Sequence, residues 1–185
     1  MKLEFGLVTV LLLVTTYSSG QRKDEAKENS SGTIPEFVIE FPKTNFKVEK
    51  TESHYTATTE NLLVTNWILQ GETNDGPFMY YVAHHKFPAE MRQEVKTNPN
   101  SLNEFFQAAM TSSAIQLGGE NFRFTAYTYE KYPGLEGICD VFNKNGFIKS
   151  RMIKVDNDVF VICAGGRKIS IDSVDTFLNS FSLKK

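Results

Sequence analysis

Apolar and polar residues alternate along most of the chain beyond residue 34, which is the pattern that half-buried β-strands produce. Residues 36–41 show it clearly, because every second residue is large and apolar and Pro42 ends the segment. Residues 62–70 and 78–85 carry apolar side chains on both faces, so we expect a sheet that is covered on both sides. The predicted strands are residues 36–41, 46–54, 62–70, 78–85, 122–129, 135–142, 147–155 and 158–164.

Two further segments have the spacing of helices with one apolar face. The first follows Ser101, which forms a capping box with Glu104, and Gly118-Gly119 ends it. Its expected buried face is Leu102, Phe105, Phe106, Ala109, Met110 and Ser113. The second helix closes the chain, with Asp172 as its N-cap. Its expected buried face is Val174, Phe177, Leu178 and Phe181.

The last four predicted strands form a run separated by short turn sequences, and the last three of them are expected to form an antiparallel meander with two tight hairpins. These turns are Tyr132-Pro133-Gly134, residues 143–146 and Asp156-Asn157, and Gly165-Gly166 ends the last strand. Together the elements predict an α+β domain, with an antiparallel sheet of about six or seven strands flanked by helices.

Charged residues share one face of this meander with large apolar residues. If Phe142 pairs with Phe147 across the turn, Asp140 lies opposite Lys149, and Arg151 lies diagonally beyond. Charges inside an apolar face need partners, so these three charged residues form a candidate polar cluster. We expect an ion cluster that stabilises the fold; the functional alternative is the floor of a polar pocket.

The same registers place Cys139 opposite Ser150 and Ser150 opposite Cys163, so one strand separates the two thiols. Two strand spacings put the cysteine Cα atoms roughly 10 Å apart, beyond the ~7 Å that a disulfide tolerates. We expect both thiols to be free, buried and protonated.

The N-terminal part of the chain differs in composition from the rest. Residues 1–20 are predicted to be a signal peptide, because the apolar run 5–14 is too short to span a bilayer and small residues follow it. Residues 21–33 are almost free of apolar side chains and predict a flexible tether. Within it, Asn29 begins a glycosylation sequon that matters only in a eukaryotic source. Residues 34–185 form one domain, and we expect a periplasmic or extracellular location.

Overall composition excludes several classes of protein. Hydrophobic residues make up 41% of the chain, which is enough for a folded core. The net charge of −2, without a basic stripe, argues against nucleic acid as a partner. No block of like charge suits a membrane surface, so we expect no membrane insertion after signal removal.

The core and turn positions resemble those of the PsbP/DcrB-type superfamily of small exported or organellar α/β/α proteins. The similar features are the opening FVIEFP strand, the central amphipathic helix with its Gly-containing turn, and the ending VFVICAGG…SIDSVDTFLNSFSL. The resemblance covers residues 34–183. It implies an antiparallel sheet flanked by helices, and a binding or accessory role without shared catalytic residues.

Candidate chemistry is sparse. There is no G-x-S-x-G elbow, paired-cysteine spacing or phosphate-binding glycine motif, so we assign no catalytic, metal or cofactor residues. His84 and His85 are adjacent on a strand and point to opposite faces, so they do not chelate one ion together. Residues 165–168, a Gly-Gly-Arg-Lys run, could cradle an anion, but Asp172 would compete for the amides, which favours a plain turn.

These observations predict a non-catalytic, extracytoplasmic binding or accessory protein, whose partner is another protein or a small ligand. The alternative is a secreted hydrolase whose site, such as a Cys139–His pair, is assembled only by the fold. A hydrolase requires a pocket with a nucleophile and a base within hydrogen-bond reach, whereas a binding module requires only an apolar or aromatic surface.

Overall fold

The computed structural model describes residues 35–56, 61–98 and 100–184, and the predicted signal peptide and tether lie outside these residues. The main sheet consists of β2 (Glu49–Thr56), β3 (Asn61–Thr73), β4 (Gly76–Lys86), β5 (Glu120–Tyr129), β6 (Tyr132–Val141), β7 (Gly146–Val155) and β8 (Asp158–Arg167). The strand order is β2-β3-β4-β8-β7-β6-β5, and each described pair of neighbours is antiparallel. The predicted α+β class and the seven-stranded antiparallel sheet are therefore confirmed.

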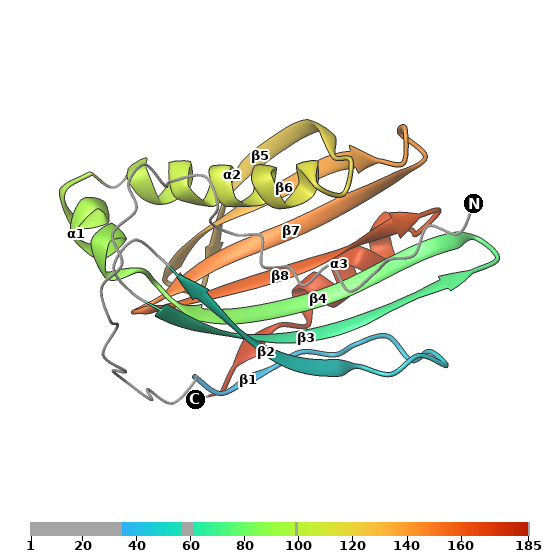
Figure 1. Ribbon diagram of the computed structural model, residues 1–185, viewed down its shortest axis with the longest axis horizontal. Coiled ribbons are helices and arrows are strands. Elements are labelled where there is room, and N and C mark those ends of the chain that lie inside the picture. The colour runs from blue at the N-terminus through green and yellow to red at the C-terminus, as the bar shows by residue number, and fades with distance from the viewer. Residues whose placement is uncertain (1–34, 57–60, 99, 185) are drawn as a thin grey trace.

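Helices lie on both faces of this sheet (Figure 1). Helix α2 (Asn100–Ile115) crosses one face and contacts β5, β6 and β7. Helix α3 (Ile171–Asn179) lies on the opposite face against β7 and β8. A third helix, α1 (Ala89–Thr97), connects β4 to α2 and was not expected from the sequence. Among the described residues, no helix has the length and apolar character needed to cross a membrane.

The first predicted strand is much shorter than expected. Only β1 (Phe37–Val38) is a strand, and it pairs with β9 (Ser182–Leu183) in a separate two-stranded sheet. The pairing is short because β9, its partner in the described part of the chain, has only two residues. The alternation is nevertheless right, since Phe37, Ile39 and Phe41 pack against the core on the α3 side.

Turn positions in the meander differ from the prediction. The β5–β6 reversal is at Glu130-Lys131, where Glu130 has a left-handed φ of 51°, and Tyr132-Pro133-Gly134 lies inside β6. Gly165 and Gly166 do not end β8, because both residues pair with β4 and with β7. A Cβ at Gly165 would collide with the Phe147 carbonyl oxygen, so the close approach of β7 requires glycine there. The Asp156-Asn157 hairpin is confirmed.

Both predicted helix starts are wrong by one or two residues. Helix α2 begins at Asn100, so Ser101 lies within its first turn, is buried, and has no partner for Oγ among the described residues. Asn98 instead accepts hydrogen bonds from the backbone amides at the start of the helix. In α3 the N-cap is Ser170, whose Oγ accepts from the Ser173 amide at 3.1 Å, and Asp172 lies in the first turn. The predicted apolar faces are correct in outline, since the following residues are buried: Leu102, Phe106, Ala109, Met110, Val174, Phe177, Leu178 and Phe181.

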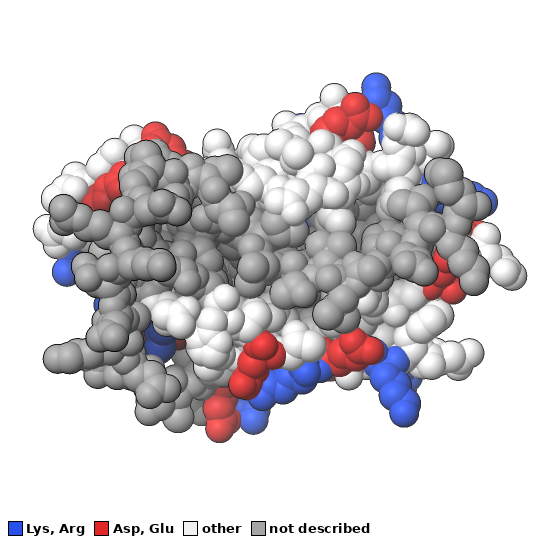
Figure 2. Space-filling view, in the orientation of Figure 1, with Lys and Arg blue, Asp and Glu red and all other residues white. Residues whose placement is uncertain are grey.

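The outer strand β2 is strongly charged. Glu49, Lys50 and Glu52 are exposed, and Lys50 Nζ lies 3.6 Å from Glu52 Oε1. Figure 2 shows acidic and basic side chains next to one another along the lower edge, where β2 runs in Figure 1. Charges on an edge strand discourage pairing with another chain.

Candidate functional site

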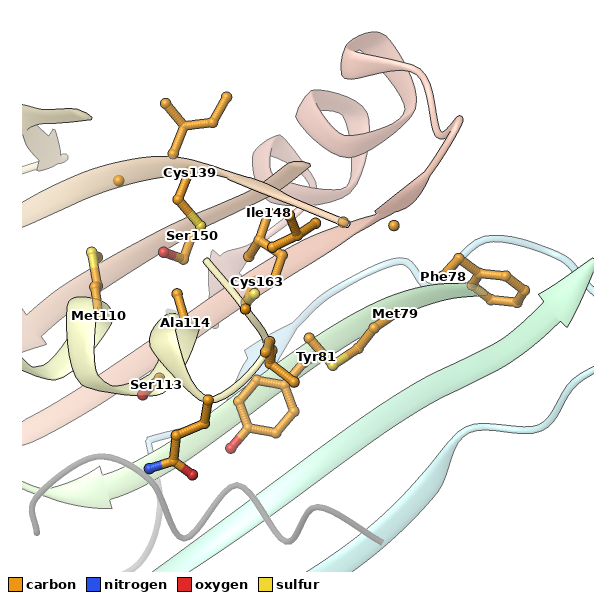
Figure 3. Close-up of a pocket in the computed structure, with 18 of the residues that line it drawn as sticks. Phe78, Met79, Tyr81, Met110, Ser113, Ala114, Cys139, Ile148, Ser150 and Cys163 are labelled. Carbon is orange, nitrogen blue, oxygen red and sulfur yellow. The ribbon is translucent and has the colours of Figure 1, made fainter. Parts of the chain in front are cut away.

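A cavity of about 680 Å³ lies between the C-terminal half of α2 and the sheet. Its roof comes from α2 and the turn that follows, and its floor from β3, β4, β6, β7 and β8 (Figure 3). The floor and roof residues that project into it include Met79, Tyr81, Met110, Ala114, Cys139, Ile148, Ser150 and Cys163. Among the described elements, α2 contacts mainly β5, β6 and β7, and the cavity lies beside it over the same face of β8 and β4.

Small residues on the floor contribute to this space. Gly137, Ser150, Cys163 and Tyr81 pair laterally across β6, β7, β8 and β4, and therefore form one row across the sheet. Three of these four residues have little or no side chain, so the row is low beneath the helix. A Cβ at Gly137 would lie 2.9 Å from the Met110 sulfur, which explains why this position has no side chain.

The cavity is apolar and almost without charge. Among the described residues that line it, Glu72 is the only charged one, and it is exposed. Uncharged polar side chains in the described lining include Gln70, Ser113, Gln116, Asn143 and Ser150. No lysine, arginine or histidine belongs to the described lining.

The ionisable groups inside the cavity keep their protons. Burial raises the pKa of the Cys139 thiol to about 11 and that of the Cys163 thiol to about 12. Burial also raises the pKa of Tyr81 strongly, and its hydroxyl donates to Asn66 Oδ1 at 2.7 Å. The thiols are free and lie on β6 and β8, with β7 between them, as the predicted strand order required. The site therefore offers neutral thiols and hydroxyls rather than an activated nucleophile.

The predicted polar cluster is rearranged. Asp140 pairs with Phe147 rather than Lys149. The reason is that the four-residue loop between β6 and β7 is residues 142–145, one position earlier than the predicted 143–146, because Val141 pairs with Gly146. Phe142, which was expected to pair in the hairpin, lies in the loop with a left-handed φ of 54°. The pairing is therefore displaced by two residues, and Cys139 lies opposite Ile148 instead of Ser150.

Glu136, and not Asp140 as predicted, is the carboxylate that pairs with the two cations of the cluster. Arg151 Nε donates to Glu136 Oε2 at 2.7 Å, and Lys149 Nζ lies 3.1 Å from Glu136 Oε1. Lys149 also donates to Asp175 on α3 at 2.7 Å, while Arg151 donates to Asn179 at 2.8 Å. Burial alone would lower the pKa of Lys149, but hydrogen bonds to Asp175 and Glu136 outweigh it and raise the pKa.

This cluster binds α3 to the sheet on the face opposite the cavity. Two cations meet two carboxylates, so the charges balance and the groups are mutually paired. Asp140 lies apart, where its Oδ2 accepts from Asn121 at 2.9 Å and Arg123 lies 3.7 Å away. Mutual pairing of these charges is what a cluster that stabilises the fold requires, and Asp140, Lys149 and Arg151 do not belong to the described lining of the cavity.

A second buried polar group lies where β4 meets β8. His84 Nε2 donates to Asp158 Oδ1 at 2.7 Å, and Lys86 Nζ lies 2.9 Å from the same oxygen. Burial raises the pKa of Asp158, but the hydrogen bonds from His84 and Lys86 outweigh this and lower it. On the other face, His85 Nδ1 donates to the Lys86 carbonyl at 2.8 Å, and burial lowers its pKa to about 4. Among the described residues, no three His, Cys, Asp or Glu side chains gather to hold a metal ion.

The Gly-Gly-Arg-Lys run does not form an anion cradle ahead of α3. Gly165, Gly166 and Arg167 belong to β8, and the Ser170 side chain occupies the amide of Ser173 at the helix start. This agrees with the preference for a plain connection, although the competing cap is Ser170 rather than Asp172.

Sequence reasoning missed the cavity, although one of its signals is present in the sequence. Three sulfur-containing or small residues of the floor, Gly137, Cys139 and Cys163, lie in otherwise large apolar strand segments. Small residues at such positions mark either close packing or empty space. Only the register of four strands and the path of α2 distinguish these two cases.

No protein-family model, curated protein or solved structure matches the chain.

Proposed function

We propose that this is a non-catalytic binding protein whose cavity between α2 and the sheet holds a small apolar ligand. The observation that carries the proposal is the cavity itself, which has a volume of about 680 Å³ and a mainly apolar lining. Ligand pockets in proteins commonly have volumes of roughly 300–1,000 Å³, with hydrophobic walls and few polar groups.

The chemistry of the lining favours binding over hydrolysis. A hydrolase needs a nucleophile with a base within hydrogen-bond reach. Cys139 and Cys163 are held as thiols, since burial raises the pKa of each, and the described lining contains no histidine that could deprotonate them. His84 is engaged by Asp158 on the opposite face of the sheet.

The proposal also includes an extracytoplasmic location and a PsbP/DcrB-like arrangement of the domain. Support for the location comes from the apolar run 5–14 followed by small residues, and support for the arrangement from the antiparallel sheet with helices on both faces. Mass analysis of the exported protein tests the location, because cleavage leaves an N-terminus at or near Gln21, whereas retention of residues 1–20 contradicts it.

Binding of an uncharged solvatochromic dye such as Nile red tests the proposed function. The wild-type protein should give saturable fluorescence enhancement with one site per chain. Ala114→Phe places a ring in the cavity and should abolish the enhancement, since Ala114 is buried against the cavity wall. Ala108→Phe is the matched control, because Ala108 lies on the same helix but is exposed.

A second cavity variant separates occlusion from unfolding. Ser150→Val fills part of the floor from the sheet side and should weaken dye binding while retaining cooperative thermal unfolding. Equal dye binding by the wild type and by folded forms of both cavity variants would show that the dye, and hence the apolar ligand, does not use this cavity.

A further inference from the structure

We propose that the ligand is electrically neutral: a hydrocarbon-rich molecule with at most one or two uncharged polar groups, such as a long-chain or polycyclic alcohol. This inference rests on the proposed function of the cavity and specifies its ligand class. It distinguishes the site from one that holds fatty acids, phospholipid headgroups or other anionic amphiphiles.

The first argument concerns anions. A carboxylate or phosphate that leaves water must be paired with a cation or with several hydrogen-bond donors, and otherwise costs several kcal/mol. The described lining has no lysine, arginine or histidine that could pair with such a group, and its single charged residue, Glu72, is exposed at the rim. Lys149 and Arg151 lie on the opposite face of the sheet and are neutralised by Glu136 and Asp175.

One cation, Arg167, lies close to a residue of the cavity lining. The Arg167 guanidinium carbon lies 5.4 Å from the ring centroid of Phe142, which lines the cavity. Arg167 itself does not line the cavity, is exposed, and follows the end of the floor on β8. It can meet a ligand only outside the cavity, where water competes for the interaction.

The second argument concerns cations. A carboxylate or a thiolate is the strongest partner for an ammonium group in the interior, stronger than the aromatic faces of the lining. Tyr81 and the two cysteines remain protonated, since burial raises the pKa of each, so they offer no negative charge. Glu72 is exposed at the rim, so it cannot compensate a cation deep in the cavity.

The remaining polar groups suit an uncharged hydroxyl or carbonyl. Ser150 projects into the cavity from the centre of the floor, between Gly137 and Cys163 in the same row of the sheet (Figure 3). A hydroxyl can both donate and accept, so one serine can orient an alcohol without fixing its charge. Met79 and Met110 line the surrounding wall, and flexible thioether side chains adapt to hydrocarbon of varied shape.

Competition between ligands that differ only in the headgroup tests this inference. 1-Dodecanol, dodecanoate and dodecylammonium are titrated, below micelle formation, against Nile red bound to the full-length protein. Dodecanol should displace half of the dye at a concentration at least about tenfold lower than either ion requires. The reason is that burying an unpaired charge costs more than about 1.4 kcal/mol, which corresponds to a factor of ten in affinity.

Two variants sharpen the result. Gln116→Lys supplies a cation at the exposed edge of the lining and should improve displacement by dodecanoate up to about fivefold, the range of an exposed ion pair, while leaving dodecanol unchanged. Arg167→Gln should leave displacement of the dye by dodecanoate and by dodecanol unchanged. Equal displacement by dodecanol and dodecanoate in the wild type, or loss of dodecanoate displacement in Arg167→Gln, would overturn the neutral-ligand inference and leave the proposed function standing. Absence of dye binding by the wild type would overturn the proposed function itself.

Discussion

The two faces of the central sheet are built from the same strands but are covered in different ways. On one face, α3, β1 and β9 pack over an aromatic core in which the rings of Phe37, Phe160 and Phe181 contact one another at centroid distances of 5.2–5.8 Å. On the other face, α2 covers β5, β6 and β7, and the floor beside it borders a cavity of about 680 Å³. In the described part of the chain, the α3 face is closed by both aromatic packing and balanced charges, whereas the α2 face borders a cavity whose lining has one charged residue, Glu72.

This difference separates stability from binding within one sheet. Close-packed side chains lose stability when any atom is removed, because the surrounding structure fills the gap only partly. Residues beside an existing cavity contribute less to stability and can vary in size. The comparison therefore predicts that substitutions on the α3 face change the free energy of unfolding most, and that substitutions in the cavity change ligand binding most.

The largest expected effect is that of Phe160→Ala on the α3 face. Phe160 is fully buried and contacts Phe37, Phe181 and His84, so its removal should lower the free energy of unfolding by about 3–5 kcal/mol. Ile148→Ala in the cavity wall is the comparison, and should cost clearly less because Ile148 is only partly buried. Urea denaturation of both variants measures the difference, and equal losses would contradict the distinction between the faces.

Acid should destabilise the α2 face through His85. Its pKa is about 4 in the folded protein against an ordinary value of 6.5, because the ring is buried. As the pH falls, the unfolded state therefore binds a proton at this ring before the folded state does. The free energy of unfolding is unaffected by His85 above pH 6.5 and falls progressively between pH 6.5 and pH 4. A shift of this size corresponds to roughly 3 kcal/mol. Asp158, whose pKa is lowered from 3.8, contributes its own loss only at more acidic pH.

Urea denaturation at pH 7 and at pH 4 measures this loss. His85→Gln should flatten the dependence, since the amide remains neutral and can still donate to the Lys86 carbonyl. His54→Gln is the control, because His54 lies exposed on β2. If the wild type and His85→Gln lose the same stability between these pH values, His85 is not the group that titrates.

The corrected register of the meander predicts a smaller difference between two carboxylates. Glu136→Gln removes the charge that Arg151 and Lys149 share, and should cost about 1.5–3 kcal/mol, the range for a hydrogen bond to a charged group. Asp140→Asn should change stability by no more than about 0.5 kcal/mol, because its closest ionic partner, Arg123, is exposed and 3.7 Å away. Thermal and urea unfolding of the two variants decide between the registers, since the opposite order would support pairing of Asp140 with Lys149.

The sheet and the faces of its helices could be predicted because alternation and helical spacing are local properties of the sequence. The register of β6 on β7 could not, because Phe142 adopts a left-handed φ that bulky residues rarely take. The displacement of two residues kept each side chain on its predicted face but changed its partner, so Glu136 replaced Asp140. The α1 helix was missed because its segment is mostly polar, and Met91 and Val95 are the only large apolar residues that mark its buried face.

The cavity depends on several such registers at once. Gly137, Ser150, Cys163 and Tyr81 come from four strands, and they form a row only if every hairpin between them is in register. The predicted pairing of Ser150 with Cys163 was confirmed, but that of Cys139 with Ser150 was wrong, so the glycine beside the serine was not recognised. The position of α2 over the outer strands is a further tertiary feature that no local pattern encodes.

The smallest expected change in stability, and the most direct comparison of the two faces, comes from adding methyl groups on each. Ser150→Val places extra atoms in the cavity floor, where space exists and where a β-branched residue suits the strand. The free energy of unfolding should therefore stay within about 0.5 kcal/mol of the wild type or rise slightly. Ala164→Val adds atoms on β8, the strand next to the one that carries Ser150, but on the α3 face, where Ala164 is fully buried. Overpacking there should cost about 1–3 kcal/mol.

Urea denaturation measures both changes, and Nile red titration should show weaker binding only for Ser150→Val. Similar destabilisation by the two valines would mean that the floor at Ser150 is as tightly packed as the core behind it, and that the cavity does not persist in solution.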